Sequence, residues 1–376
     1  MEISLPKYLK ITIILLGVFL CLWFLQSFRP VFIPLAFAAL FAFALLPLCN
    51  RLESVKVPRT IAIVICLLGL MAVLSLLIWF LSSQIMSLSR DMPNITEHFE
   101  RLVGRLQDFL YFNFDIEPQN RQDLIRNSLG RLSETGTALM GSTIAITTDA
   151  LTVLGLIPIY IFCMLYYRDH FRHFIFRFVH KDKRSSAMGT VDAIQRVIGS
   201  YLSGLMIVIL IVAILNSVGL MIVGVSYPIF FGVFASILTI IPYIGILIGA
   251  LLPALFVLAV TGSIVKPLIV IGIFTFVQFL EGNFITPYIT GSKVSINPFA
   301  AILALIVGGH IWGAAGMVLA IPAIAVAKVL FDSYEPLEPF GFLLCDISAY
   351  TPPNQRRKHP ILERIKNLAR LNPKKP

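Results

Sequence analysis

The sequence predicts an all-α polytopic membrane protein with about eight transmembrane helices, two of them broken or re-entrant, and an extracytoplasmic helical insertion. Three observations predict this class. The 376 residues are 57% hydrophobic and only 13% charged, whereas about a quarter of a soluble domain is charged. The mean hydropathy is +0.87. The apolar residues gather in runs of about 20, the length that spans a hydrocarbon core. A soluble globule, a disordered chain and a disulfide scaffold are excluded.

Eight apolar runs are long enough to be candidate spans. They cover residues 11–28, 31–49, 60–81, 144–167, 200–224, 228–260, 264–280 and 298–331. Phe28-Arg29-Pro30 joins the first two runs, and no small-residue cleavage pattern follows the first. We therefore expect the first two runs to form an uncleaved helical hairpin.

This pattern divides the chain into six segments. They are three N-terminal transmembrane helices (1–81), an extracytoplasmic insertion (82–143), a fourth transmembrane helix (144–167), a basic cytoplasmic linker (168–199), a C-terminal transmembrane bundle (200–335) and a basic cytoplasmic tail (336–376). Apolar residues in the insertion recur at alternating steps of 3 and 4 from Ile85 to Phe109, which is typical of a helical seam. The insertion is interpreted either as a helical pair packed on itself or as a contact within a homo-oligomer.

The positive charges predict the orientation. With the N-terminus inside, most of the 30 Lys and Arg residues fall on the inner side. We therefore expect a multi-pass protein of the bacterial inner membrane with both termini in the cytoplasm. The net charge of +10 suits loops that face an anionic leaflet. Segment 168–199 is basic and aromatic, which indicates an interfacial helix. No nucleic-acid partner is expected.

Signatures of soluble enzyme chemistry are missing from the sequence. There is no GxxxxGK[ST] loop, no HExxH and no GxSxG. The five cysteines show no metal-ligand spacing. We expect neither an enzyme nor a bound metal or cofactor.

Two apolar runs do not fit a single straight span. Run 228–260 would be about 50 Å long as one helix and contains Pro242 and Pro253, while run 298–331 is rich in glycine and contains Pro322. Each is either a kinked span or a re-entrant hairpin. Either form places irregular backbone at membrane depth, where it is tolerated only beside protein or a wet cavity.

The polar residues of the C-terminal half gather near these breaks. Pro242-Tyr243 in one apolar run is echoed by Pro287-Tyr288 after another, and paired interrupted helices are typical of a transporter site. Candidate substrate- or ion-binding residues are Glu281, Asn283, Gln278, Pro242, Tyr243, Pro287, Tyr288, Gly291 and His310. Alternatively, Glu281 lies at the membrane interface, and His310 is hydrogen-bonded within a packed helix.

Small residues predict where helices approach closely. Gly245 and Gly249, and likewise Gly309 and Gly313, have the GxxxG spacing of close helix packing. Asn216 lies in run 200–224, and we interpret it as hydrogen-bonded to a neighbouring helix.

Three stretches resemble the autoinducer-2 exporter (AI-2E) family of permeases. They are IIPYIGILIGALLPAL at 240–255, QFLEGNFITPYITG at 278–291 and INPFAAILALIVGGHIWGAAGMVLAIPAIAVAK at 296–328. The resemblance covers roughly residues 10–335, and it implies an eight-helix membrane protein. Some members of that family are assigned export of a signalling furanone, and others Na⁺(Li⁺)/H⁺ antiport.

These observations predict a secondary transporter that exports a small polar solute, with the lipid bilayer, the solute and H⁺ or Na⁺ as its partners. The solute would bind where the breaks at Pro242-Tyr243 and Pro287-Tyr288 meet the glycine-rich stretch 308–316, with Glu281, Asn283 and Gln278 as the proton or cation site. The alternatives are a Na⁺(Li⁺)/H⁺ antiporter and a non-transporting membrane scaffold built on the seam at 85–109.

Overall fold

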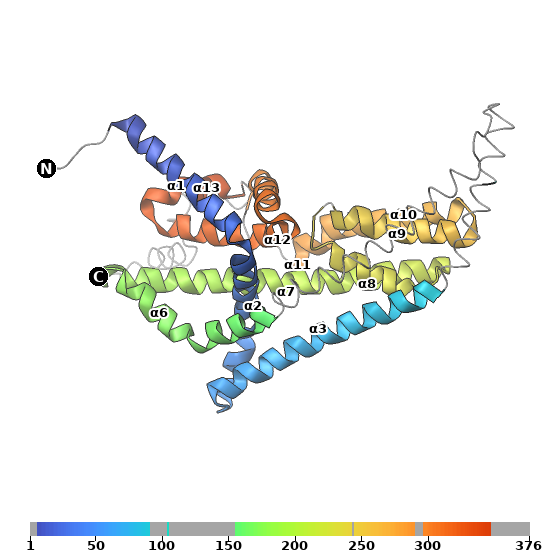
Figure 1. The fold of residues 1–376 in the computed structure, drawn as a ribbon, viewed down its shortest axis with the longest axis horizontal. Helices are drawn as coiled ribbons and strands as arrows, with labels where there is room; N and C mark the ends of the chain where they lie inside the picture. The colour runs from blue at the N-terminus through green and yellow to red at the C-terminus, as the bar shows by residue number, and fades with distance from the viewer. Residues whose placement is uncertain (1–5, 91–103, 105–154, 243, 290–295, 347–376) are drawn as a thin grey trace, which may run out of the picture.

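The computed structural model describes residues 6–90, 104, 155–242, 244–289 and 296–346. Within these ranges no strand occurs, and the one β-bridge joins Ile296 to Cys345. The predicted class is confirmed, because the chain is an all-α polytopic membrane protein (Figure 1). Most of the predicted insertion, most of the basic tail, and the candidate residues Tyr243 and Gly291 lie outside the described residues.

The N-terminal helices are α1 (Lys7–Ser27), α2 (Arg29–Ser54) and α3 (Arg59–Arg90). The expected hairpin between the first two apolar runs is wrong. Phe28 N–H bonds to the Phe24 carbonyl at 3.0 Å, and Phe32 N–H bonds to the Phe28 carbonyl at 3.1 Å. Helical bonding therefore continues through a bend, and α1 and α2 diverge in Figure 1. Pro30 does not reverse the chain, because proline is tolerated in the first turn of a helix.

A long helix, α7 (Arg184–Val223), organises the rest of the molecule. It is preceded by the helix Gly155–Tyr166, by α6 (Arg168–Arg177) and by the 3₁₀ turn Lys181–Lys183. Its 40 residues span about 60 Å, so it extends far beyond a hydrocarbon core of about 30 Å. It ends at Gly224, whose left-handed φ of 72° closes the last turn with a bond to the Met221 carbonyl.

The apolar run 228–260 is a helical hairpin made of α8 (Pro228–Leu238) and α9 (Ile244–Thr261). The rings of Phe231 and Phe256 lie 5.1 Å apart. Towards the tip, a Cβ on Gly249 would lie 2.9 Å from the Ala235 Cβ. From Phe231 to Ala235 on α8 the residue numbers rise, while those of their partners on α9 fall from Phe256 to Gly249, so the two helices are antiparallel. At about 16 Å, α8 crosses only half of a hydrocarbon core.

Local chemistry explains where this hairpin turns. The Thr239 hydroxyl donates to the Ser236 carbonyl at 2.6 Å, which competes with helical bonding at the end of α8. Pro242 has no N–H to continue a helix. Gly245 then opens α9 so close to α8 that a Cβ there would lie 1.7 Å from the Leu238 carbonyl oxygen.

The next segment is longer than the predicted run 264–280. Helix α10 (Val265–Leu280) continues as a π-helix, η2 (Glu281–Ile285), and as α11 (Thr286–Ile289). A π-helix is rare, and such turns are frequently found at functional sites. The polar residues Glu281, Asn283 and Thr286, which the sequence placed after the apolar run 264–280, therefore form the last turns of this helical segment.

The run 298–331 also folds back on itself. Helix α12 (Pro298–Ser333) contains non-helical backbone at Trp312 and Gly313, and Gly313 has a φ of 60°. A Cβ on Gly308 would lie 3.2 Å from the Ala320 Cβ, although twelve residues of straight helix span about 18 Å. Thus α12 is a second hairpin. It is followed by the 3₁₀ turn η4 (Glu335–Leu337) and by α13 (Glu338–Leu344).

The two hairpins pack on opposite ends of α7 (Figure 1). The α8–α9 hairpin shares a core with Leu220, near the end of α7. Leu319 of α12 packs with Ile198 and Leu202, nearer its start. Between them, Val277 of α10 packs on Val208 and Val212. The tip of the first hairpin and the π-helix therefore converge on the C-terminal half of α7, between Val208 and Asn216.

Among the described residues, five helices are long and apolar enough to cross a membrane, and four shorter apolar helices accompany them. One of the five is α12, which the turn at Trp312–Gly313 divides. Large apolar side chains are exposed along α1 and α3. Such an apolar surface is stable in lipid and not in water.

Candidate functional site

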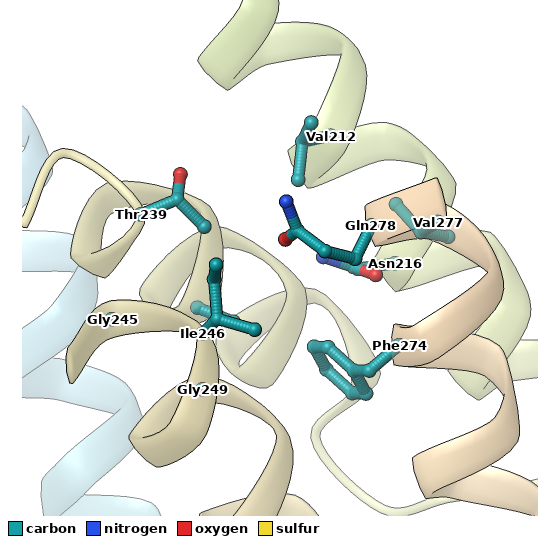
Figure 2. A pocket seen from close by; sticks show the side chains of 10 residues that line it. Val212, Asn216, Thr239, Gly245, Ile246, Gly249, Phe274, Val277 and Gln278 are labelled. Carbon is teal, nitrogen blue, oxygen red and sulfur yellow. The ribbon is translucent and has the colours of Figure 1, made fainter. Parts of the chain in front are cut away.

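A small pocket lies where α7, the α8–α9 hairpin and α10 meet (Figure 2). Its interior has room for about one water molecule. Three polar side chains line it, and they are Asn216 of α7, Thr239 at the hairpin tip and Gln278 of α10. Its other lining residues are Val212, Ala235, Gly245, Ile246, Gly249, Phe274 and Val277. The mixture of apolar walls and a few converging polar groups resembles the lining of a ligand site, but the space is only large enough for a water molecule.

Asn216 is the most unusual of the lining residues. Its side chain is only 3% exposed, and its Oδ1 has no hydrogen-bond partner among the described residues. An unsatisfied buried polar group costs about 1–3 kcal/mol. The side chains of Asn216 and Gln278, from α7 and α10, overlap in the view of Figure 2, and both line the pocket. The hydrogen-bonding capacity of Asn216 is therefore free to meet a polar molecule in the pocket.

Glu281 is joined to the pocket through Gln278. The Nε2 of Gln278 donates to Oε2 of Glu281, and the Thr286 hydroxyl donates to Oε1 at 3.1 Å. Thr286 is five residues beyond Glu281, so the π-helix places these side chains on one face. The carboxylate is thus held by two donors and lies one hydrogen bond from the pocket.

The tip of the hairpin supplies the third polar group. Because the Thr239 hydroxyl hydrogen is committed to Ser236, its oxygen presents only lone pairs to the pocket. Gly245 and Gly249 line the same wall and allow α8 and α9 to touch. The two glycines selected for close packing therefore shape the pocket as well as the hairpin.

The other predicted site residues lie away from this pocket. Asn283 is exposed and donates to the Phe279 carbonyl of its own helix at 2.9 Å. Tyr288 is 93% exposed, and Pro287 is exposed beside it. Pro242 is half-buried at the hairpin break but is not a lining residue.

The glycine-rich stretch of α12 is separate from the pocket. None of its residues lines the pocket. Gly309 packs against Met317, Gly313 makes the turn, and His310 is exposed. Trp312 donates from Nε1 to the Leu25 carbonyl of α1 at 3.0 Å. The expected meeting of stretch 308–316 with the two Pro-Tyr breaks is not seen among the described residues.

Reasoning from the sequence missed Asn216 and Thr239 as lining residues of the pocket. The interpretation of Asn216 as hydrogen-bonded to a neighbouring helix is wrong for the described residues, because its Oδ1 has no partner there. The sequence feature that could have identified Asn216 is its position as the only amide side chain in the apolar run 200–224. Among the described residues, no group of three or more His, Cys, Asp or Glu side chains is placed to hold a metal.

The model of the AI-2E family transporters matches residues 12–336, which includes every helix that forms the pocket. The chain belongs to the AI-2E transporter family. It is therefore a multi-pass membrane protein of a transport family, as the resemblance in its C-terminal half predicted.

Several relatives of this AI-2E protein carry names as transport proteins, some of them provisional. YrrI of Bacillus subtilis is 28% identical over 306 residues, which cover 80% of this chain and 86% of that protein. YueF of the same organism is 26% identical over 317 residues, which cover 82% of this chain and 85% of YueF. TqsA of Escherichia coli K12, named an AI-2 transport protein, is 24% identical over 353 residues, which cover 90% of this chain and 96% of TqsA.

Proposed function

We propose that this AI-2E family protein is a secondary exporter of a small polar solute, and that the solute passes through the pocket between Asn216, Thr239 and Gln278. The observation that carries the proposal is the buried, unpartnered oxygen of Asn216. A chain retains such a group at a cost of about 1–3 kcal/mol. A polar molecule that binds there recovers this energy.

The backbone around the pocket supports the same function. Interrupted helices near the middle of the membrane are where many secondary transporters bind their substrates. Here the tip of the α8–α9 hairpin and the π-helix both pack on the C-terminal half of α7, between Val208 and Asn216.

The autoinducer AI-2 is the first solute to test, because TqsA is named for its transport. AI-2 is polar, as are the amides and the hydroxyl that line the pocket. Because the pocket holds only about one water molecule, the hairpin tip must move away from α7 and α10 for AI-2 to pass. The experiment is efflux of AI-2 from vesicles that contain the purified protein. Efflux above that of protein-free vesicles supports this solute, and equal rates reject it.

A second function, Na⁺(Li⁺)/H⁺ antiport, is favoured by one observation. The Glu281 carboxylate is held by Gln278 and Thr286 beside the pocket, and a carboxylate exchanges protons and binds hard cations. A Na⁺ pulse should collapse an imposed pH gradient in vesicles only if the protein is an antiporter. The Lys and Arg distribution further supports a place in the bacterial inner membrane with both termini in the cytoplasm.

We expect Glu281→Gln to remove proton coupling in either function. Glutamine keeps an acceptor for Gln278 but cannot take up or release a proton. Solute efflux or Na⁺-driven proton movement should then no longer respond to an imposed pH gradient across the vesicle membrane. Asn283→Ala is the matched control, because Asn283 is exposed and bonds only within its own helix. A response to the pH gradient equal to that of the wild type would remove Glu281 from the mechanism.

A further inference from the structure

Helix α6 carries a stripe of large apolar side chains that the rest of the protein does not cover. Phe171, Phe174, Ile175 and Phe178 follow one another at steps of 3, 1 and 3, which places them on one face of a helix. Each of the four is between 45% and 78% exposed. At ten residues the helix is about 15 Å long and cannot cross a membrane.

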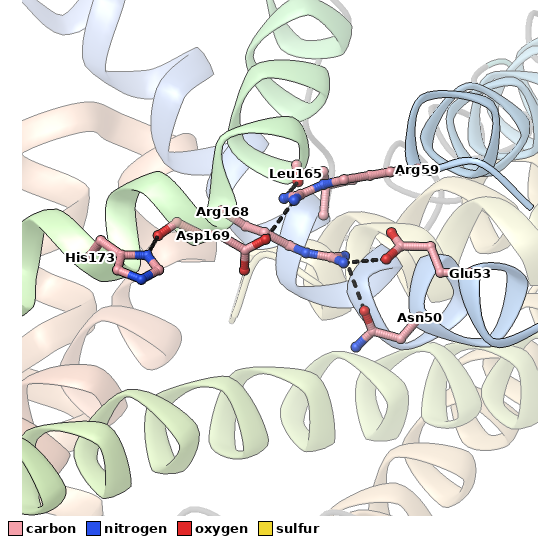
Figure 3. A network of polar contacts seen from close by, with 7 residues as sticks. All are labelled: Asn50, Glu53, Arg59, Leu165, Arg168, Asp169 and His173. Atoms are coloured by element: carbon pink, nitrogen blue, oxygen red, sulfur yellow. Dashed lines mark hydrogen bonds and ion pairs between the residues drawn. The ribbon is translucent and has the colours of Figure 1, made fainter. Parts of the chain in front are cut away.

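The first turn of α6 is fixed to the helical bundle (Figure 3). Arg168 bonds to Glu53 and, at 3.0 Å, to Asn50, both near the end of α2. Arg59 of α3 bonds to Asp169 at 2.6 Å and to the Leu165 carbonyl at 2.7 Å. These contacts set the rotation of α6, so the apolar stripe is held facing outward.

The position of α6 places this stripe at the edge of the membrane. The apolar helix Gly155–Tyr166 leads directly into α6, because Phe171 N–H bonds to the Tyr167 carbonyl and Tyr167 N–H bonds to the Cys163 carbonyl, both at 2.9 Å. A helix with one apolar and one charged face at that depth lies in the interface, with its apolar face among the acyl chains.

Four cations border the stripe without an ion pair to any described side chain. They are Arg177 at the end of α6, Lys181 and Lys183 in the 3₁₀ turn, and Arg184 at the start of α7. All four are exposed. By contrast, Arg172 faces the bundle side and pairs with Asp192 at 3.4 Å. Unpaired cations beside an apolar stripe match a surface that offers acyl chains and phosphates together.

We propose that α6 and the turn after it form a binding site for anionic phospholipid, which we call the α6 lipid site. The stripe Phe171, Phe174, Ile175 and Phe178 contacts the acyl chains, and the four cations contact the headgroup phosphates. A soluble anion would satisfy the cations but leave the stripe in water. A bilayer with an anionic surface satisfies both.

The depth of the stripe is tested with a cysteine at Phe174 in a protein without its five native cysteines. The cysteine carries a bimane fluorophore, and the vesicles contain lipids with a nitroxide on the acyl chain. We expect Phe174→Cys to be quenched at least about threefold more than Ser186→Cys, an exposed polar position on α7. Equal quenching at the two positions would overturn the proposal.

The headgroup preference is tested with the variant in which Arg177, Lys181, Lys183 and Arg184 become glutamine. Each cation near an anionic surface strengthens binding by roughly fivefold. We expect phosphatidylglycerol to raise the melting temperature of the wild type more than phosphatidylcholine does, and the variant to need at least about tenfold more phosphatidylglycerol for half of that rise. Lys266→Gln, an exposed cation on α10, should behave as the wild type.

Two further outcomes decide the source of the anion. Inorganic phosphate should leave the melting temperature unchanged. Salt at 0.5 M should weaken the effect of phosphatidylglycerol, because the Debye length is about 10 Å at 0.1 M and shorter at higher ionic strength. A melting temperature that rises with phosphate alone, or a variant that keeps the wild-type preference for phosphatidylglycerol, would contradict an anionic lipid at this site.

Discussion

Replacement of Asn216 by leucine is expected to remove most of the flux while leaving the protein at least as stable as the wild type. Leucine has a similar size, but it offers no hydrogen bond to a solute in a space about one water molecule wide. Loss of one buried hydrogen-bonding group costs about 1–3 kcal/mol, which corresponds to roughly a 5- to 150-fold lower rate. Efflux of AI-2, or Na⁺-driven proton movement, measures this loss in vesicles.

The free energy of unfolding of Asn216→Leu should not fall together with its flux. Leucine removes a buried oxygen that has no partner in the described structure, so the free energy of unfolding should stay constant or rise by about 1 kcal/mol. Ser217→Ala is the matched control, because Ser217 is buried on the same helix but does not line the pocket. If Asn216→Leu lost stability in proportion to flux, Asn216 would have a structural role instead.

The second large effect is expected at Gly245. A Cβ there would lie 1.7 Å from the Leu238 carbonyl oxygen and 2.7 Å from the Thr239 nitrogen. Both atoms belong to the backbone, so Gly245→Ala must push the two helices of the hairpin apart. Overpacking of this kind costs about 3 kcal/mol or more when the backbone cannot move aside. The melting temperature and the fraction of monodisperse protein in detergent should both fall sharply.

A glycine in open surroundings separates this effect from helix propensity. A Cβ on Gly272 of α10 would meet nothing within 4 Å, and alanine is favoured over glycine inside a helix by about 1 kcal/mol. Gly272→Ala should therefore be neutral or stabilising. A Gly245→Ala protein as stable as Gly272→Ala would show that α8 and α9 are not in contact at their tip.

The sequence predicted the membrane class and the position of each apolar run, because these follow from composition and length. It also located irregular backbone at Pro242 and around the glycines of 308–316. The direction of the chain after a break was not predictable, since the composition of a 33-residue run is the same whether the run forms a kinked span or a hairpin. The contact of Gly308 with Ala320, which defines the second hairpin, depends on backbone angles at Trp312 and Gly313.

The candidate site was predictable only in part, for a related reason. Gln278 and Glu281 were selected as polar residues after an apolar run, and they lie in and beside the pocket. Asn216 became a candidate only when the rotation of α7 was known, because burial and the missing partner of Oδ1 are properties of three packed helices. His310 and Tyr288 were selected by the same polarity rule and are exposed.

If solute passes at the tip of the α8–α9 hairpin, water must reach the residues there, and silver ions can detect that water. Ag⁺ reacts with a thiol only where water can carry it, and it is small enough for a narrow passage. In a protein without native cysteines, Thr239→Cys and Gln278→Cys should react with Ag⁺ and lose flux, while Val270→Cys, which is 0% exposed in the core, should not. If the two pocket cysteines were as unreactive as the one at Val270, the passage would not exist.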